Sequence, residues 1–131
     1  IEVPAYNDGV AFLYVIPRSA PLEDLFVRDE ITEFAIAKGD ISGTGKLKMP
    51  LIAAIPGGFV EIAGGRGEQS YPTPTLEVEE GSVVITRLPR TGPDPNLVWE
   101  SRTPFTMPWR AIIVAETRDK LAQSPINALL K

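Results

Sequence analysis

The chain has 131 residues, with 13 Lys+Arg against 17 Asp+Glu, and it contains no His and no Cys. This length allows one domain with a real core and excludes a large barrel or a two-domain enzyme. The missing residue types exclude His-based acid/base chemistry, thiol chemistry, zinc fingers and disulfides. A net charge of -4 argues against nucleic-acid binding, because phosphates repel an acidic surface.

The first residues read as a strand already in progress, beginning at Ile1 rather than Met. No apolar run approaches membrane-spanning length, and no signal-peptide pattern precedes the first turn. We therefore expect a processed, truncated or excised piece of a longer protein. The 13 Pro residues are about twice the average usage, which favours short strands with turns over a helical bundle.

The first half of the chain predicts strands separated by tight turns. Residues 7–9 (NDG) are a strong turn signal, since these residue types tolerate positive φ. The apolar run 10–16 predicts a central strand buried on both faces. Residues 31–36 predict a second strand, with Phe34 and Ile36 on one face and Glu33 on the other.

Two hairpins are expected in the middle of the chain. One strand covers residues 47–55, turns at 56–58 (PGG) and returns over 59–63. The second hairpin turns around 80–81 and joins 76–78 to 83–85. The acidic residues of this hairpin alternate with apolar ones, which is typical of the solvated face of an edge strand. These acidic residues are Glu77, Glu79 and, at the turn, Glu80.

The last third mixes an irregular segment with regular elements. Five prolines between residues 89 and 108 predict an irregular surface excursion. A buried strand is expected over 109–115, then a short helix over 117–123 with Thr117 as its N-cap, and a final strand over 126–130. The whole pattern predicts an all-β antiparallel sandwich of roughly seven or eight strands, with one short helix near the C-terminus.

Two glycine-rich stretches are candidate ligand loops. Residues 42–46 (SGTGK) resemble a phosphate loop only superficially, because Asp40 and Leu47 stand where Gly and Ser or Thr are required. Residues 64–68 (GGRGE) do not lead into a helix, which excludes a dinucleotide site. A functional loop and a plain connection are equally compatible with the second stretch.

Carboxylates and aromatic rings are the remaining candidates for chemistry. No Asp/Glu spacing matches an EF-hand loop, and no spacing selects the two carboxylates that glycoside hydrolysis requires. Trp109 begins an apolar strand and is expected in the core. Trp99, in the proline-rich excursion, is the better candidate for an exposed aromatic that could bind a substrate sugar.

Several segments together resemble the N-terminal domain of glycoside hydrolase family 97, a family of α-glucosidases and α-galactosidases. The most specific are residues 5–12 (AYNDGVAF) and 107–115 (MPWRAIIVA). Residues 30–34 (EITEF) and the hairpin 50–62 (PLIAAIPGGFVEI) follow in the same order. The order and rough spacing hold along nearly the whole chain.

The resemblance implies the second half of a galactose-mutarotase-like β-sandwich, so residues 1–131 would be a single, partial domain without its catalytic (β/α)8 barrel. In the family this domain packs on the barrel, lends a loop to the active-site rim and supplies a Glu that helps bind calcium. That Glu would fall near Gly64 or Gly65, and Glu68 is the nearest carboxylate that a shifted loop could supply. The resemblance also implies a secreted bacterial parent enzyme, periplasmic or extracellular, that binds carbohydrate.

Two functional hypotheses follow. The first is a non-catalytic accessory segment of a family 97-like glycosidase, whose partners are the missing barrel or the first half of the sandwich. The second is a free-standing carbohydrate-binding or protein-interaction sandwich. Because half a sandwich leaves strand edges uncovered, homo-oligomers are also expected. Neither hypothesis predicts a membrane or nucleic-acid partner.

Overall fold

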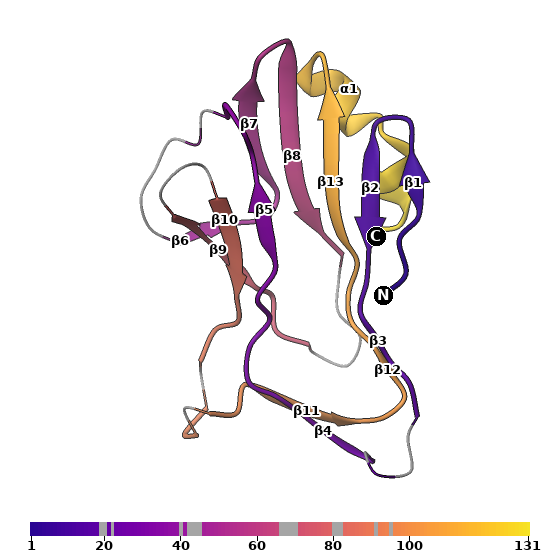
Figure 1. Ribbon diagram of the computed structural model, residues 1–131, viewed down its shortest axis with the longest axis vertical. Coiled ribbons are helices and arrows are strands. Elements are labelled where there is room, and N and C mark those ends of the chain that lie inside the picture. The colour runs from indigo at the N-terminus through magenta and orange to yellow at the C-terminus, as the bar shows by residue number, and fades with distance from the viewer. Residues whose placement is uncertain are drawn as a thin grey trace.

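The computed structural model describes residues 1–18, 21, 23–39, 41, 46–65, 71–79, 83–90, 92–94 and 96–131. Within these ranges the chain is almost entirely strands and connections (Figure 1). The elements are β1 (Ala5–Tyr6), β2 (Gly9–Phe12), β3 (Val15–Ile16), β4 (Asp24–Val27), β5 (Glu33–Ala35), β6 (Lys46–Lys48), β7 (Leu51–Ile55), β8 (Gly58–Gly64), β9 (Thr75–Glu79), β10 (Val83–Arg87), β11 (Trp99–Arg102), β12 (Phe105–Thr106), β13 (Arg110–Ala115), α1 (Arg118–Ala122) and a 3-10 helix (Pro125–Ala128).

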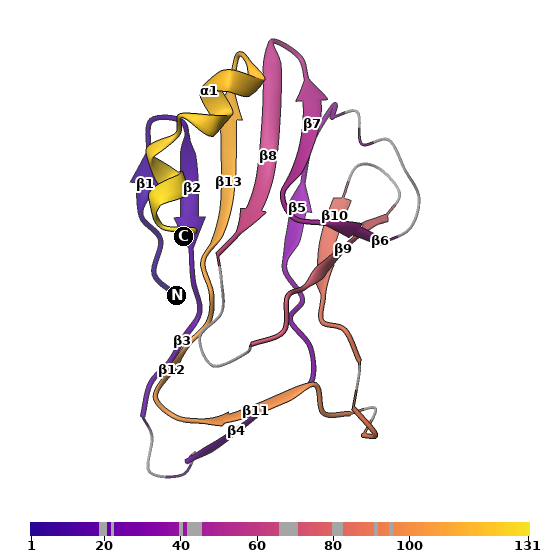
Figure 2. The same ribbon diagram turned by 180° about the vertical axis from the view of Figure 1, so that it is seen from behind.

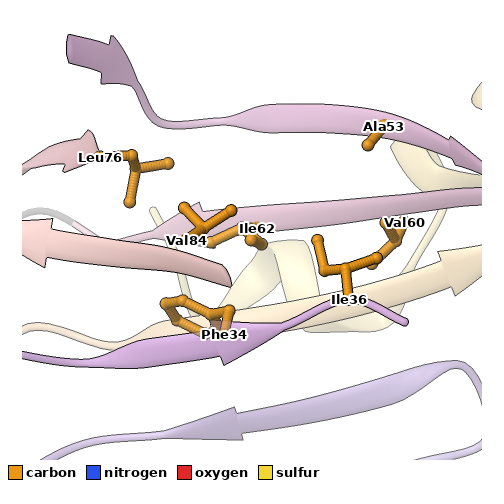
Figure 3. Packing of buried hydrophobic residues seen from close by; sticks show 7 residues of the cluster. All are labelled: Phe34, Ile36, Ala53, Val60, Ile62, Leu76 and Val84. Carbon is orange, nitrogen blue, oxygen red and sulfur yellow. The ribbon is translucent and has the colours of Figure 1, made fainter. Parts of the chain in front are cut away.

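Two antiparallel sheets form the sandwich and confirm the all-β prediction. One has the strand order β1-β2-β13-β8-β7 and the other β5-β10-β9-β6. Side chains from both sheets meet in one core, because alternate residues of each strand point to the same face. Figure 3 shows this core, which consists of Phe34, Ile36, Ala53, Val60, Ile62, Leu76 and Val84.

The opposite face of the five-stranded sheet is covered by the C-terminal helices (Figure 2). Thr117 is the N-cap of α1, as predicted, and its side chain accepts a hydrogen bond from the Lys120 amide. The predicted strand over 126–130 is wrong, because Ser124 caps a 3-10 helix that begins with Pro125. Ile126 is fully buried in this layer, and its packing favours the compact helix over an extended tail.

The segment between residues 89 and 108 contains two strands, so the predicted irregular excursion is wrong for its second part. β11 pairs with β4 to form a two-stranded ribbon, and β12 pairs with β3. Pro93 precedes β11 and Pro104 lies between β11 and β12, so neither removes a donor from these ladders. The ribbon lies at the end of the molecule away from α1 (Figure 1).

Three other expected elements differ in detail. The apolar run 10–16 is divided between β2 and β3, and the run 47–55 between β6 and β7, which belong to different sheets. The hairpin of β7 and β8 and that of β9 and β10 are confirmed as antiparallel pairs. However, β9 is not an edge strand, because β6 pairs along its other side. Residues 80–82 of its turn lie outside the described ranges.

Candidate functional site

The most buried ion pair among the described residues joins Glu30 and Arg110. Arg110 donates from Nε to Glu30 Oε1 at 2.6 Å and from Nη2 to Oε2 at 2.7 Å. The side chains are 1% exposed for Arg110 and 3% for Glu30. The Tyr71 hydroxyl donates a third hydrogen bond to Glu30 Oε2 at 2.9 Å. We call these three residues the Glu30 cluster.

Separate parts of the sandwich position the members of the Glu30 cluster. Arg110 is the first residue of β13, on the same face as the core residue Ile112. Glu30 lies in the connection between β4 and β5, where its carbonyl accepts from Thr86 Oγ1 at 2.9 Å. Thr86 Oγ1 also accepts from the Thr32 amide at 2.8 Å. The threonine of β10 thereby holds the chain on both sides of Ile31 and aims Glu30 inward.

Both oxygens of the Glu30 carboxylate are engaged, which leaves no oxygen free for acid/base work. Burial, and then the neighbouring Glu30 carboxylate, raise the pKa of Tyr71 well above its usual range. The phenol therefore stays protonated as a donor to Glu30. The cluster joins three distant segments of the chain and acts as a structural tie. The sequence analysis did not identify the Glu30 cluster. The position of Arg110 on the inward face of an apolar strand was the signal that could have indicated it.

The glycine at the expected calcium-ligand position lies against the ends of two side chains. A Cβ on Gly64 would lie 2.7 Å from Met49 Cε and 3.1 Å from Arg110 Nη1. At Gly65 a Cβ would lie 3.3 Å from Trp109 Cβ. The space next to Gly64 is occupied by a thioether and a guanidinium, which do not suit a hard cation. The residues at this position therefore do not fit calcium, and Glu68 lies outside the described residues.

Trp99 is half-buried on the inner side of the β4–β11 ribbon. Its ring centroid is 4.7 Å from that of Phe105 and 5.3 Å from that of Tyr71. A hollow of about 360 Å³ is lined in part by Leu97, Val98 and Trp99. The ring thus closes an aromatic cluster and borders a small hollow, and its role in substrate binding stays a prediction. Trp109 is half-buried against the helix-covered core.

The other carboxylates are dispersed. Glu77 pairs with Arg87 at 3.6 Å across β9 and β10. Glu61 is 9% exposed on β8, and burial raises the pKa of its carboxyl group. Over the ranges that the structure describes, no three acidic, His or Cys side chains gather where they could hold a metal ion. In the same ranges, no helix is long and apolar enough to span a membrane.

No protein-family model matches this sequence, and no curated protein matches it either. Solved structures do match. A glycoside hydrolase family 97 enzyme from Pseudoalteromonas sp. strain K8, in complex with acarbose, aligns with 98% of this chain at 21% identity and a TM-score of 0.71. A single-residue variant of a family 97 enzyme from the same strain, in complex with panose, aligns with 98% of this chain at 22% identity and a TM-score of 0.65. A beta-arabinopyranosidase aligns with 88% of this chain at 17% identity and a TM-score of 0.61.

These alignments confirm, at the level of fold, the resemblance to family 97 that the sequence motifs indicated. The chain spans 23% of the length of the family 97 structures and 24% of that of the arabinopyranosidase. Its 131 residues therefore have the fold of a segment found within larger glycoside-processing enzymes.

Proposed function

We propose that this chain is part of the non-catalytic N-terminal β-sandwich of a family 97-like glycoside hydrolase. In this role it packs on a catalytic barrel outside the 131 residues and shapes the rim of its active site. The observation that carries the proposal is the fold match, which covers 98% of this chain and 23% of a family 97 enzyme.

The chemistry of the described residues supports an accessory role. The chain has no His and no Cys, and its most buried carboxylate, Glu30, is engaged by Arg110 and Tyr71. The family 97 neighbours were solved with acarbose and panose, so carbohydrate is the proposed substrate class of the larger enzyme. We also propose, as the resemblance implies, that this enzyme is periplasmic or extracellular. Calcium binding by the larger enzyme remains a prediction. Gly64, at the expected ligand position, has no side chain that could coordinate the ion.

Exposed apolar residues support the proposal that a further segment of the larger protein packs on this chain. Val114 is 46% exposed on the inner side of β13, where the four-stranded sheet lies opposite a five-stranded one. Ile1 and Val3, next to the edge strand β1, are 77% and 58% exposed. We propose that further strands of the same sandwich, or the barrel, cover these residues. In isolation the chain should self-associate, and a strictly monomeric particle at high concentration would favour a complete domain instead.

Hydrolysis assays test the non-catalytic role. The purified chain should not turn over 4-nitrophenyl α-glucoside or α-galactoside, and clear turnover would contradict the proposal. The full reading frame provides a second test, because we expect it to encode a (β/α)8 barrel downstream of these residues. If a barrel is present, the separately expressed barrel should bind this chain, and the reconstituted pair should hydrolyse one of the two substrates better than the barrel alone.

The alternative is a free-standing carbohydrate-binding or protein-interaction sandwich, and the hollow beside Trp99 favours it. Replacing Trp109 by Phe leaves Trp99 as the one tryptophan, because the chain has two. Titration of this variant with maltose and melibiose should change its fluorescence if the hollow binds sugar. An unchanged emission spectrum would count against the hollow as a sugar site.

A further inference from the structure

The four-stranded sheet has an open edge at β5. Among the described residues, β5 pairs with β10 on one side and with no strand on the other. The Thr86 amide of β10 donates to the Thr32 carbonyl at 2.9 Å. Hydrogen-bonded residues alternate with non-bonded ones along an antiparallel ladder, so Phe34 also bonds to β10. The amides and carbonyls of Glu33 and Ala35 therefore point to the open side.

The open edge of β5 lies beside an uncovered part of the five-stranded sheet. In Figures 1 and 2 the four-stranded sheet lies on the β7 side of the molecule, and β2 and β1 lie beyond β13. Val114 of β13 is 46% exposed on the inner face. Val10 of β2 is half-buried on the same face, because its register partner Ile112 packs into the core. Strands lie about 4.8 Å apart and packed sheets about 10 Å apart, so a strand added beside β5 would lie over these residues.

We propose that an extended segment of the larger protein pairs with β5 through the main-chain groups of Glu33 and Ala35. As a fifth strand of this sheet it satisfies their amides and carbonyls and places alternate side chains over Val10 and Val114. The chemistry of the segment follows from the two faces that it meets. Its inward residues are apolar, and an outward Lys or Arg beside Glu33, which is exposed, pairs with that carboxylate.

Other occupants do not fit this edge. A second copy pairing antiparallel through β5 is related to the first by a two-fold axis perpendicular to the sheet. Both five-stranded sheets then lie on the same side, and their strands β13, β2 and β1 overlap above the junction. The outer helices of a (β/α)8 barrel use their backbone groups internally, so they can cover Val114 but cannot pair with Glu33 and Ala35. A single strand satisfies both the edge and the apolar face.

This inference rests on the proposed function, since it names the partner segment that the accessory role requires, but the two fail separately. A full-length protein that hydrolyses a glycoside and leaves the Glu33 and Ala35 amides unprotected would refute the pairing alone. Protection of these amides in a full-length protein that has no barrel and no hydrolytic activity would refute the accessory role alone.

Hydrogen exchange in the isolated chain and in the protein encoded by the full reading frame tests the pairing. The amides of Glu33 and Ala35 should exchange rapidly in the isolated chain and at least about 100-fold more slowly in the full-length protein. The amide of Phe34, which bonds to β10, is the internal control and should be protected in both. Equal exchange of Glu33 and Ala35 in the two proteins would overturn the proposal, as would a reading frame that adds no residues. Protection that depends on the concentration of the isolated chain would assign the edge to a second copy and would also overturn it.

A substitution at the edge gives an independent test. Ala35→Pro removes one amide that faces the open side, and proline is tolerated in an edge strand when its nitrogen points away from the ladder. In the full-length protein it should speed exchange of the Glu33 amide by about tenfold or more, because one inter-strand hydrogen bond is lost. The Phe34 amide should stay protected, which shows that the ladder to β10 is intact. Ala35→Ser keeps the amide and is the matched control. Unchanged protection of Glu33 in Ala35→Pro would contradict pairing at this edge.

Discussion

Replacing Arg110 by Met should destabilise the sandwich severely, because it breaks the Glu30 cluster from one side. Methionine fills much of the space but cannot pair with a carboxylate. Glu30, whose side chain is 3% exposed, would then keep, among the described residues, only the Tyr71 hydroxyl as a partner for its carboxylate. A charge that is buried and no longer paired must be desolvated without compensation, or must take up a proton.

The magnitude follows from the two contacts that are lost. Their lengths of 2.6 and 2.7 Å are those of charge-assisted hydrogen bonds. Hydrogen bonds to charged groups contribute about 1.5–3 kcal/mol each, and breaking a buried ion pair costs about 3–5 kcal/mol. We therefore expect a loss of about 3–5 kcal/mol, a large part of the roughly 5–15 kcal/mol that holds a typical domain folded.

Urea unfolding followed by circular dichroism measures this loss, and Arg87→Met provides the control. Arg87 is 32% exposed and lies 3.5 Å from Asp29 and 3.6 Å from Glu77, so its loss should cost less than about 1 kcal/mol. Replacing both members of the buried pair, as Glu30→Leu with Arg110→Met, should recover part of the stability, because no charge is then left unpaired.

The reasoning fails if Arg110→Met costs no more than Arg87→Met. The double variant provides a second check. The reasoning also fails if Glu30→Leu, added to Arg110→Met, lowers the free energy of unfolding further instead of raising it. In either case the ion pair would not be what stabilises the contact between β13 and the connection before β5. A changed slope of the urea transition would indicate that the denatured or native state had changed its compactness, and would require a second probe.

Three further predictions concern single side chains, each measured by urea unfolding. Tyr71→Phe should cost about 1.5–3 kcal/mol through the lost bond to Glu30. Because burial raises the pKa of Tyr71, the stability of the unaltered chain should be complete below about pH 10 and fall above it, and this fall should be smaller in Tyr71→Phe. Burial also raises the pKa of Glu61, so Glu61→Gln should stabilise at pH 7 and have little effect below about pH 4. Thr117→Ala should cost about 1 kcal/mol, because the Lys120 amide loses its capping acceptor.

Sequence reasoning succeeded where structure depends on neighbours along the chain. The hairpin of β7 and β8 follows from alternating apolar residues and a turn at Gly57, whose φ of 85° favours glycine. The N-cap at Thr117 likewise depends on a contact three residues away. The same reasoning failed for residues 126–130, because the burial of Ile126 against a distant sheet decided their conformation.

The candidate sites likewise combine features that the local sequence indicates with features that only tertiary packing determines. Trp99 was selected for its place in the proline-rich segment, but the ring packs with Phe105 and Tyr71 in an aromatic cluster. The open edge of β5 attracted no notice in the sequence, since it depends on which strands share a sheet. Gly64 was recognised as a departure from the family pattern, and only the packing shows that the ends of Met49 and Arg110 lie against it.

The sequence by itself determined the all-β class, the two central hairpins and the capped helix. These features depend on residue alternation, turn chemistry and local hydrogen bonds. The tertiary structure decided which strands share a sheet, which aromatic ring reaches solvent and how Glu30 meets Arg110. Glu30 and Arg110 are 80 residues apart in the chain, and only the packing of two sheets encloses both in a space from which water is excluded. Their pairing therefore follows from desolvation, which no local pattern encodes.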